Sequence, residues 1–427
     1  MQSRYRFFPP PVYDAIVLLI AAYLSHHKLI ACWIDPSCMA AGAIADYSLW
    51  GMIVIAVLLF LARESKLGRY WEAWRRNKLL FLFVLYAMVS VTWSVLPERS
   101  IHAVFVMVAS AVTASAFAIL RPPKTIFGYA YTFTLLAGIL SLLTILLAPC
   151  TGIHQDPVWQ GAWRGIFSHK NDLGPLMALG NNLALLWFIG AKEKRGKFAA
   201  VLCYFFTLMM AVMSRSATAV ILWFVLTGMT AFYFAWIKWG HLLRRVSRTT
   251  ITGILSGILG AAILSVAALF QLTGKNIQLT GRIPLWKNLI DQVVSERPWF
   301  GYGMDTLWFS REFQRWASET SGWGDVAYVL SGHNGYVDIL LHLGAVGLIL
   351  LIVLLVQAVV RATARAISGR TWLNVFPLLA LVYVLTANIT VSYMLEQENF
   401  HWMLLIAIQF LPEGEFPASG HTEALNG

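Results

Sequence analysis

Charged residues are scarce in this 427-residue chain, where Asp, Glu, Lys and Arg make up 12% of the sequence, about half their share in soluble proteins. Hydrophobic residues make up 58%. This balance excludes an ordinary soluble domain or a disordered chain, because apolar runs recur almost from end to end. The sequence therefore predicts an all-α polytopic membrane protein in which residues 1–427 form a single integral membrane domain.

Acidic residues are also fewer than basic ones, which gives a net charge of +11. The twelve predicted membrane helices cover residues 13–30, 43–62, 79–95, 101–120, 125–149, 173–191, 198–213, 217–237, 251–271, 335–360, 371–391 and 400–412. With a cytoplasmic N-terminus, about twenty Lys and Arg fall in inside segments and about ten outside, as the positive-inside rule requires. Both termini are therefore expected in the cytoplasm, and the basic charge indicates membrane topology, with no nucleic acid partner.

Cysteine is rare, with four residues, and the sequence has no CxxC pair and no cluster of His and Cys. No metal site and no cofactor are predicted. Cys32 and Cys38 share the first outside loop, where a disulfide and two free thiols both remain open. The first apolar run lacks a convincing small-residue cleavage site after it, so we expect its helix to be retained.

The outside face is predicted to carry one large loop, residues 272–334, between the ninth and tenth helices. It contains an amphipathic helix that ends before Pro298. Its apolar face is predicted to comprise Ile283, Trp286, Leu289, Ile290, Val293 and Val294. The stretch "PWFGYG" at 298–303 then favours a tight turn.

Four charged or titratable residues lie at helix ends on the predicted outside face: Arg164, Arg215, Arg282 and His333. Each one alone has a simple explanation, because interfacial arginines often extend to lipid phosphates and a histidine can cap a helix. Together they indicate a site. Arginine presents a permanently charged fork that suits phosphate oxygens, so three arginines and a histidine suit a lipid-linked diphosphate.

The chemistry follows from the charge that develops when a sugar–diphosphate bond breaks. Arginines in a partly dry site stabilise a negatively charged leaving group. His333 accepts a proton near neutral pH, and we leave open whether it deprotonates the attacking hydroxyl or assists the leaving group.

The motifs "WRGIFSHKNDLG", "SRSAT", "TGRIPLW" followed by "PWFGYG", and "GHNGYVDILLHLG" occur in this order on the predicted outside face. In this respect the chain resembles the O-antigen ligase and polysaccharide polymerase family, including Wzy-type, WaaL-like and ExoQ-like members. The spacing from His333 to Gly344 is similar to the family's final motif. The match in motifs covers about residues 160–350. The resemblance implies a GT-C-like helical fold and a metal-independent glycosyltransferase that uses an undecaprenyl diphosphate-linked saccharide.

By motif position, the resemblance implies that Arg215 and Arg282 bind the diphosphate and that His333 acts at the reacting centre. The predicted substrate-binding residues are Arg164, His169, Asn171, Asn334, Tyr336 and Asp338. The stretch "HKN" also favours a helix cap, with Asn171 or Asp172 as the capping side chain. Asp338 either orients His333 or faces a water-filled cavity.

We expect polymerisation of lipid-linked repeat units into an exopolysaccharide or O-antigen at the periplasmic face of the bacterial inner membrane. The donor glycan, a saccharide acceptor and the bilayer are the expected partners, with a chain-length regulator as an open candidate. The main alternative is an O-antigen ligase that transfers polysaccharide to lipid A core. A transporter is the weaker alternative, because the middle connection "KEKRGK" is short and intramembrane charges are scarce.

Overall fold

The computed structural model describes residues 39–63, 65–243, 282–320, 331–369, 371–393 and 400–411. The predicted helices 13–30 and 251–271, and the Cys32–Cys38 pair, lie outside the described residues. Over the described ranges the fold is helical, apart from an isolated bridge between Ile153 and Trp163.

Six of the described helices are long and apolar enough to cross a membrane. They are α6 (Pro97–Leu120), α7 (Pro123–Leu147), α9 (Lys170–Gly190), α10 (Lys194–Met213), α11 (Ala217–Leu243) and α15 (Gly335–Gly369). The bent pair α3 (Met39–Arg63) and α4 (Leu67–Arg76) adds a seventh span if the two are counted as one. The chain is a multi-pass membrane protein.

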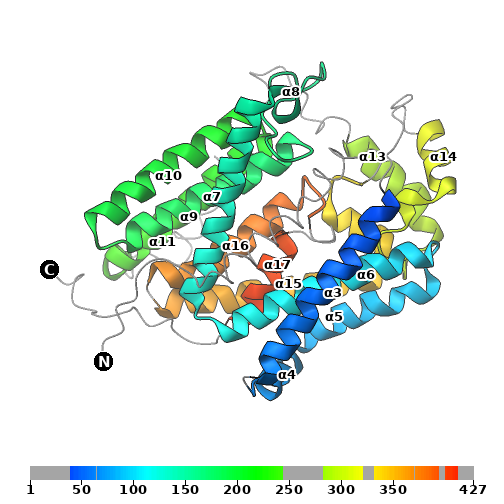
Figure 1. The fold of residues 1–427 in the computed structure, drawn as a ribbon, viewed down its shortest axis with the longest axis horizontal. Coiled ribbons are helices and arrows are strands. Elements are labelled where there is room, and N and C mark those ends of the chain that lie inside the picture. The colour runs from blue at the N-terminus through cyan, green and yellow to red at the C-terminus, as the bar shows by residue number, and fades with distance from the viewer. Residues whose placement is uncertain are drawn as a thin grey trace.

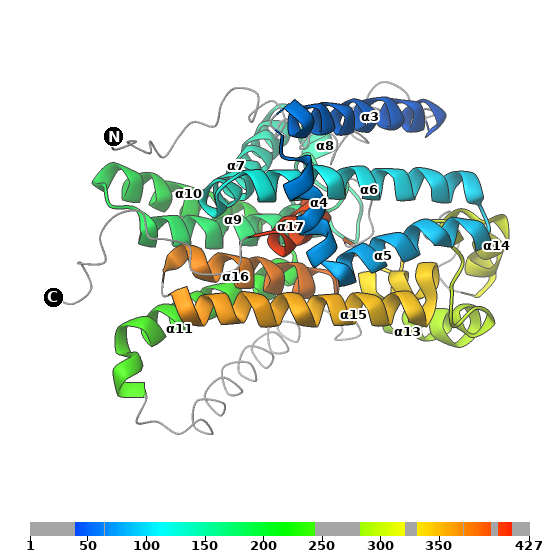
Figure 2. The same cartoon turned by 90° about the horizontal axis from the view of Figure 1, so that it is seen from below.

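Shorter helices complete the described fold. They are α5 (Lys78–Val89), η1 (Ser90–Trp93), α8 (Pro149–Gly152), α13 (Arg282–Asn288), η3 (Leu289–Val293), η4 (Val294–Glu296), η5 (Leu307–Phe309), α14 (Arg311–Thr320), α16 (Trp372–Ala387) and α17 (Phe400–Gln409). Two groups of helices flank a central pair. Helices α7, α9, α10 and α11 lie on one side and α3, α5 and α6 on the other, with α16 and α17 between them. Helix α15 runs along both α16 and α5 (Figures 1 and 2).

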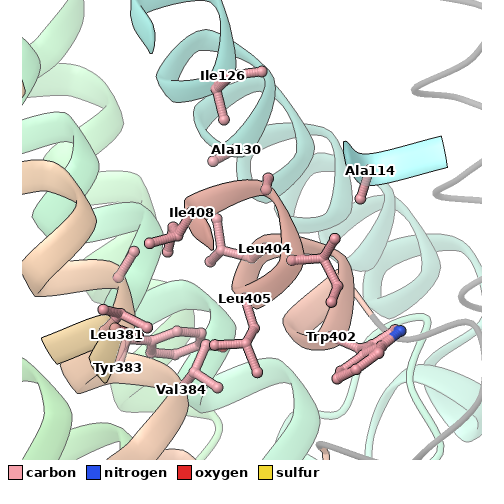
Figure 3. Close-up of a cluster of buried hydrophobic side chains, with 14 of the residues drawn as sticks. Ala114, Ile126, Ala130, Leu381, Tyr383, Val384, Trp402, Leu404, Leu405 and Ile408 are labelled. Carbon is pink, nitrogen blue, oxygen red and sulfur yellow. The ribbon is translucent and has the colours of Figure 1, made fainter. Parts of the chain in front are cut away.

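The central pair is the most deeply buried part of the bundle. Helix α17 has only ten residues, yet it inserts Trp402, Leu404, Leu405 and Ile408 among α6, α7 and α16 (Figure 3). Apolar helices gain little hydrophobic free energy when they exchange contacts with lipid for contacts with each other, so close packing of side chains is what holds the two groups together.

Helix α16 is shorter than the sequence predicts. The apolar run favoured a helix over 371–391, but the helix ends at Ala387 and residues 388–390 form a turn. A 16-residue helix rises about 24 Å, less than the roughly 30 Å hydrocarbon core. The prediction of helix was wrong for 388–391, because the polar groups of Asn388 and Thr390 form hydrogen bonds within and around a buried turn.

Helix α15 is broken at Gly344, whose φ of 66° and ψ of −170° are open essentially to glycine alone. The break leaves backbone groups without helical partners, and the 298–303 turn satisfies them. The amides of Tyr302 and Gly303 donate to the carbonyls of Leu341 and His342, both at 2.9 Å. Beyond the break, the amides of residues 345 and 346 donate to the carbonyls of residues 298 and 299 at 2.8 and 3.2 Å.

The amphipathic helix predicted within residues 272–334 forms as a continuous helical run from α13 through η3 to η4, and it ends before Pro298. Leu289, Val293 and Val294 are buried as predicted, but Ile290 is 45% exposed. The assignment of Ile290 to the buried face was wrong, because η3 is a π-helix whose wider turn changes the helical phase.

We predict that Gly344→Ala destabilises the protein by about 1–3 kcal/mol, since alanine must adopt a backbone conformation that excludes a side chain. A β-carbon there would also meet the backbone of Trp299 and Phe300. The thermal unfolding midpoint of the detergent-solubilised chain measures this. Gly128→Ala is the control, because nothing lies within 4 Å of its β-carbon position. Equal midpoints for the two variants would contradict the interpretation.

Candidate active site

His154 anchors the loop before α9. Its Nδ1 lies 2.9 Å from Asp156 Oδ2, and its Nε2 accepts the backbone N–H of Lys170 at 3.2 Å. An accepting Nε2 places the ring proton on Nδ1, where it faces the carboxylate. Burial lowers the pKa of His154, in agreement with this neutral form. The sequence analysis missed His154, although "IHQD" places a carboxylate two residues after a histidine.

His169 is the N-cap of α9. Its Nδ1 accepts the backbone N–H of Asn171 at 3.2 Å, while Asp172 Oδ2 accepts the backbone N–H of His169 at 3.2 Å. The prediction of a cap in "HKN" is confirmed, but the capping side chain is His169 and not Asn171 or Asp172. Because Nδ1 accepts, the neutral ring carries its proton on Nε2.

The turn between α10 and α11 presents Arg215. Its side chain is exposed, and Nη1 donates to the carbonyl of Gln160 at 3.1 Å. The Arg215 carbonyl accepts from Lys170 Nζ at 3.3 Å, and Ser216 Oγ donates to Asn171 Oδ1 at 2.9 Å. The turn is therefore fastened both to the 149–169 loop and to the start of α9.

Residues 388–393 connect four elements of the site. Thr390 accepts through its carbonyl from Arg282 Nη1 at 2.6 Å, and its hydroxyl lies 2.7 Å from that of Thr218 at the start of α11. Tyr393 donates its hydroxyl to the carbonyl of Asn171 at 2.7 Å.

The same segment also holds the start of α15, because the amide of Gly335 donates to the carbonyl of Asn388 at 2.9 Å. Sequence analysis did not select these residues. The available signal was three polar residues, Asn388, Thr390 and Ser392, at alternate positions in an otherwise apolar run.

His333 lies immediately before α15. Ser331 Oγ accepts its backbone N–H at 3.3 Å and lies 3.4 Å from its Nδ1. On the other side, Trp286 Nε1 donates to the carbonyl of Gly332 at 2.7 Å, which ties this segment to α13. The contact brings α13, which bears Arg282, against the segment that bears His333.

Arg215 and His333 share an unusual backbone conformation, with φ values of 50° and 49°. Left-handed backbone is uncommon for residues other than glycine and costs free energy that the surroundings must supply. Such residues cluster at active sites and ligand clamps. Two of the three residues predicted to be catalytic thus have a strained backbone, which supports the prediction that both have a functional role.

Arg282, His333 and His169 form one electrostatic group. Burial, and then the positive charge of Arg282, lower the pKa of His333 to about 4. Burial lowers the pKa of His169 to about 3, with further contributions from His154, Lys170, His333 and Arg282. Both rings are therefore neutral at pH 7, and each can exchange a proton beside a fixed positive charge.

Arg164 lies within the 149–169 loop. Its Nε donates to the carbonyl of Thr151 at 2.7 Å, and its Nη1 lies 3.5 Å from the carbonyl of Ser168. Its charge contributes to lowering the pKa of His154. Part of its guanidinium group thus braces the loop, and its predicted role in binding substrate stays a prediction.

The remaining predicted substrate-binding residues make contacts with the protein. Asn334 Oδ1 caps α15 by accepting the amides of Tyr336 and Val337 at 3.0 and 3.3 Å. Tyr336 donates its hydroxyl to the carbonyl of Leu385 at 3.1 Å. Asp338 accepts the amide of Gly332 at 2.8 Å, so its contact is with the backbone next to His333.

No group of three His, Cys, Asp or Glu side chains is placed to hold a metal ion within the described ranges. The arginines and neutral imidazoles of this arrangement can bind anions and transfer protons.

Comparison with known proteins adds to this geometry. Residues 183–352 match the family model described as O-Antigen ligase. Over this region the chain resembles the O-antigen ligase family. It is also 26% identical over 347 residues to the exopolysaccharide production protein ExoQ of Rhizobium meliloti (strain 1021), covering 76% of this chain and 72% of that protein. The resemblance predicted from the four motifs is confirmed.

The matched region contains the three residues predicted to be catalytic, Arg215, Arg282 and His333. It also contains Asn334, Tyr336 and Asp338, whereas Arg164, His169 and Asn171 precede it. The start of α9, which precedes the matched region, contacts the turn that bears Arg215.

We predict that the protein loses stability as the pH falls from about 6.5 towards 4. A histidine in the unfolded chain has a pKa near 6.5. His333 has a folded-state pKa of about 4, so the unfolded chain binds more protons in this window. Thermal unfolding midpoints between pH 7.5 and 5 measure the slope. His333→Gln flattens it, and an unchanged slope in this variant would contradict the assigned pKa.

Proposed function

We propose that this protein is a membrane glycosyltransferase that polymerises undecaprenyl diphosphate-linked repeat units into an exopolysaccharide or O-antigen. The observation that carries the proposal is the grouping of Arg282, His333 and His169, with Arg215 presented next to the start of α9. The match of residues 183–352 to the O-antigen ligase model and the similarity to ExoQ support the same activity.

The arginines are assigned to the diphosphate. Arg282 uses Nη1 to hold the Thr390 carbonyl, and a guanidinium group has five N–H donors, so others remain to face phosphate oxygens. Arg215 is exposed and held by its contact with Gln160, which reduces the entropy lost when it binds an anion. Two fixed cations stabilise the charge that develops on the leaving lipid diphosphate.

His333 is assigned to the proton transfer. A hydroxyl oxygen of the acceptor attacks the anomeric carbon of the donor glycan, and the bond from that carbon to the diphosphate oxygen breaks with its electron pair on the diphosphate. The acceptor's proton passes to the neutral imidazole as base, or reaches the diphosphate with the imidazole assisting the leaving group. In the first case, the phosphate charge bound beside His333 raises the pKa of its ring and favours the transfer.

Polymerisation is preferred to ligation because the relative ExoQ bears a name for exopolysaccharide production. The name of the family model, O-Antigen ligase, favours the alternative transfer of a finished chain to lipid A core. Both reactions use the same bond cleavage, so they differ in the acceptor alone.

The number of membrane spans and the orientation of the chain in the membrane are part of the same proposal. We assign twelve membrane spans in a GT-C-like arrangement, both termini in the cytoplasm, and loop 272–334 and the site on the periplasmic side of the inner membrane. The distribution of Lys and Arg between the loops supports this orientation. We also propose that the reaction is independent of metal, since arginines are available to carry the phosphate charge.

His333→Ala and Arg282→Ala should each lower polysaccharide synthesis by about 100-fold or more, because general acid–base and electrostatic contributions have this size. Each variant is expressed in a strain that lacks the protein, and its level in the membrane is checked by blotting. The surface polysaccharide and the lipid-linked precursors are then sized. Single repeats on the lipid carrier indicate a polymerase, and full-length lipid-linked chains indicate a ligase.

The control is Arg195→Ala, which removes an exposed arginine at the start of α10, away from the site. It should leave synthesis at the wild-type level. Normal polysaccharide from both His333→Ala and Arg282→Ala, with the proteins present in the membrane, would refute the catalytic assignment.

A further inference from the structure

Two cavities lie at the end of the bundle opposite His333. Helix α15 starts beside His333, and its last turns carry Arg361 and Arg365 at the other end. The cavities have volumes of about 480 and 360 Å³, and both are lined by Ala73, Arg76 and Phe410. Because they share one wall, they act as two halves of a single recess.

The lining of this recess is strongly basic. Its arginines are Arg69, Arg76 and Arg121 in the larger cavity and Arg76, Arg361 and Arg365 in the smaller one. Among the described residues of the lining there is one carboxylate, Glu72, which pairs with Arg76 at 3.0 Å. Five arginines against one glutamate favour an anion.

Two of these arginines are held in place by neutral oxygens. Arg361 Nη1 donates to Asn77 Oδ1 at 3.0 Å, and Arg365 Nη2 donates to the carbonyl of Leu411 at 3.2 Å. Both contacts orient a guanidinium group from the end of α15 towards the segment that lines the smaller cavity. Preorganised forks of this kind suit phosphate oxygens.

Gln409 supplies an independent sign of a ligand. It lines the smaller cavity and is 6% exposed, and its Nε2 has no hydrogen-bond partner among the described residues. A buried amide donor without an acceptor costs free energy, and each such group calls for an explanation. An anionic oxygen bound in the cavity would satisfy it.

The position of the recess favours a lipid over a soluble anion. Helix α4 lines both cavities and is amphipathic, with Tyr70 and Trp74 hydrogen-bonded to Ser115 on α6 and Trp71 56% exposed. Exposed tryptophan and arginine on a short helix after a membrane span are typical of the headgroup layer. The apolar part of the lining, Ile119, Leu120, Ile408, Phe410 and Leu411, can accept the start of acyl chains.

We propose that this recess binds the phosphate headgroup of an anionic phospholipid from the leaflet at that end of the bundle. Basic pockets between membrane helices are the usual place for such headgroups. The site is separate from the glycosyl-transfer site and does not depend on the function proposed above.

The test compares two neighbouring arginines on α4. Arg76 lines both cavities and is largely exposed at its side chain, whereas Arg75 is exposed and lines neither. The purified full chain is titrated with phosphatidylglycerol and with phosphatidylcholine in detergent, and bound lipid is counted by native mass spectrometry. Arg76→Gln should weaken phosphatidylglycerol binding about fivefold, while Arg75→Gln binds as the wild type does.

A second variant tests the buried donor. Gln409→Glu keeps the size of the side chain and replaces the amide donor with a carboxylate, so it should weaken phosphatidylglycerol binding further. Thermal unfolding midpoints establish that each variant is folded. Equal binding by the Arg75 and Arg76 variants, or equal binding of the two lipids, would overturn the proposal. Displacement of the lipid by pyrophosphate at equal concentration would overturn the lipid assignment in favour of a soluble phosphate compound.

Discussion

The constraint on which the site depends is the need to satisfy backbone and side-chain polar groups inside an apolar bundle. Because α16 ends at Ala387, residues 388–393 form a polar turn within the helices. Its groups pair with Arg282, Thr218 and the first residue of α15, and Tyr393 reaches the start of α9. Water is absent from the hydrocarbon core, so such groups must find partners in the protein. The hydrogen bonds that satisfy the polar groups of this turn therefore also join the segments that bear the candidate residues.

The break in α15 obeys the same rule. Gly344 frees backbone groups on either side, and the turn 298–303 pairs with them across a long separation in sequence. This joins the end of the amphipathic run from α13 to η4 to the helix that follows His333. The Trp286 contact with Gly332 adds a second connection between these segments. Irregular backbone thus fixes the relative position of Arg282 and His333, which two straight helices would leave to side-chain packing alone.

Electrostatics then set the chemical state of the site. Burial and the charge of Arg282 keep His333 and His169 neutral at pH 7, so the imidazoles add no positive charge of their own. The site therefore combines fixed cations with neutral proton acceptors. In the proposed reaction, the diphosphate pairs with the arginines and raises the proton affinity of the nearby ring, because opposite charge favours the protonated form. In this proposal, diphosphate binding and proton transfer to the imidazole are coupled, because the bound diphosphate changes the electrostatic potential at the ring.

The sequence by itself determined that the chain is helical and crosses the membrane. Long apolar runs are stable in lipid as helices, because a helix satisfies its own backbone hydrogen bonds there. It also pointed to Arg215, Arg282 and His333, because charges at the ends of apolar helices are costly and stand out. Tertiary structure decided the rest. The turn at 388–393 lay inside an apolar run, and His169 and not its neighbours provides the N-cap side chain of α9. Asp156 gave a local signal for His154, but the contact of His154 with the backbone of Lys170 came from the fold. The pairing of residues 298–303 with the Gly344 break uses main-chain groups that every residue carries, so no side-chain pattern encodes it. Periodicity is a local property, whereas these contacts join segments far apart in the chain and exist only once the helices have packed.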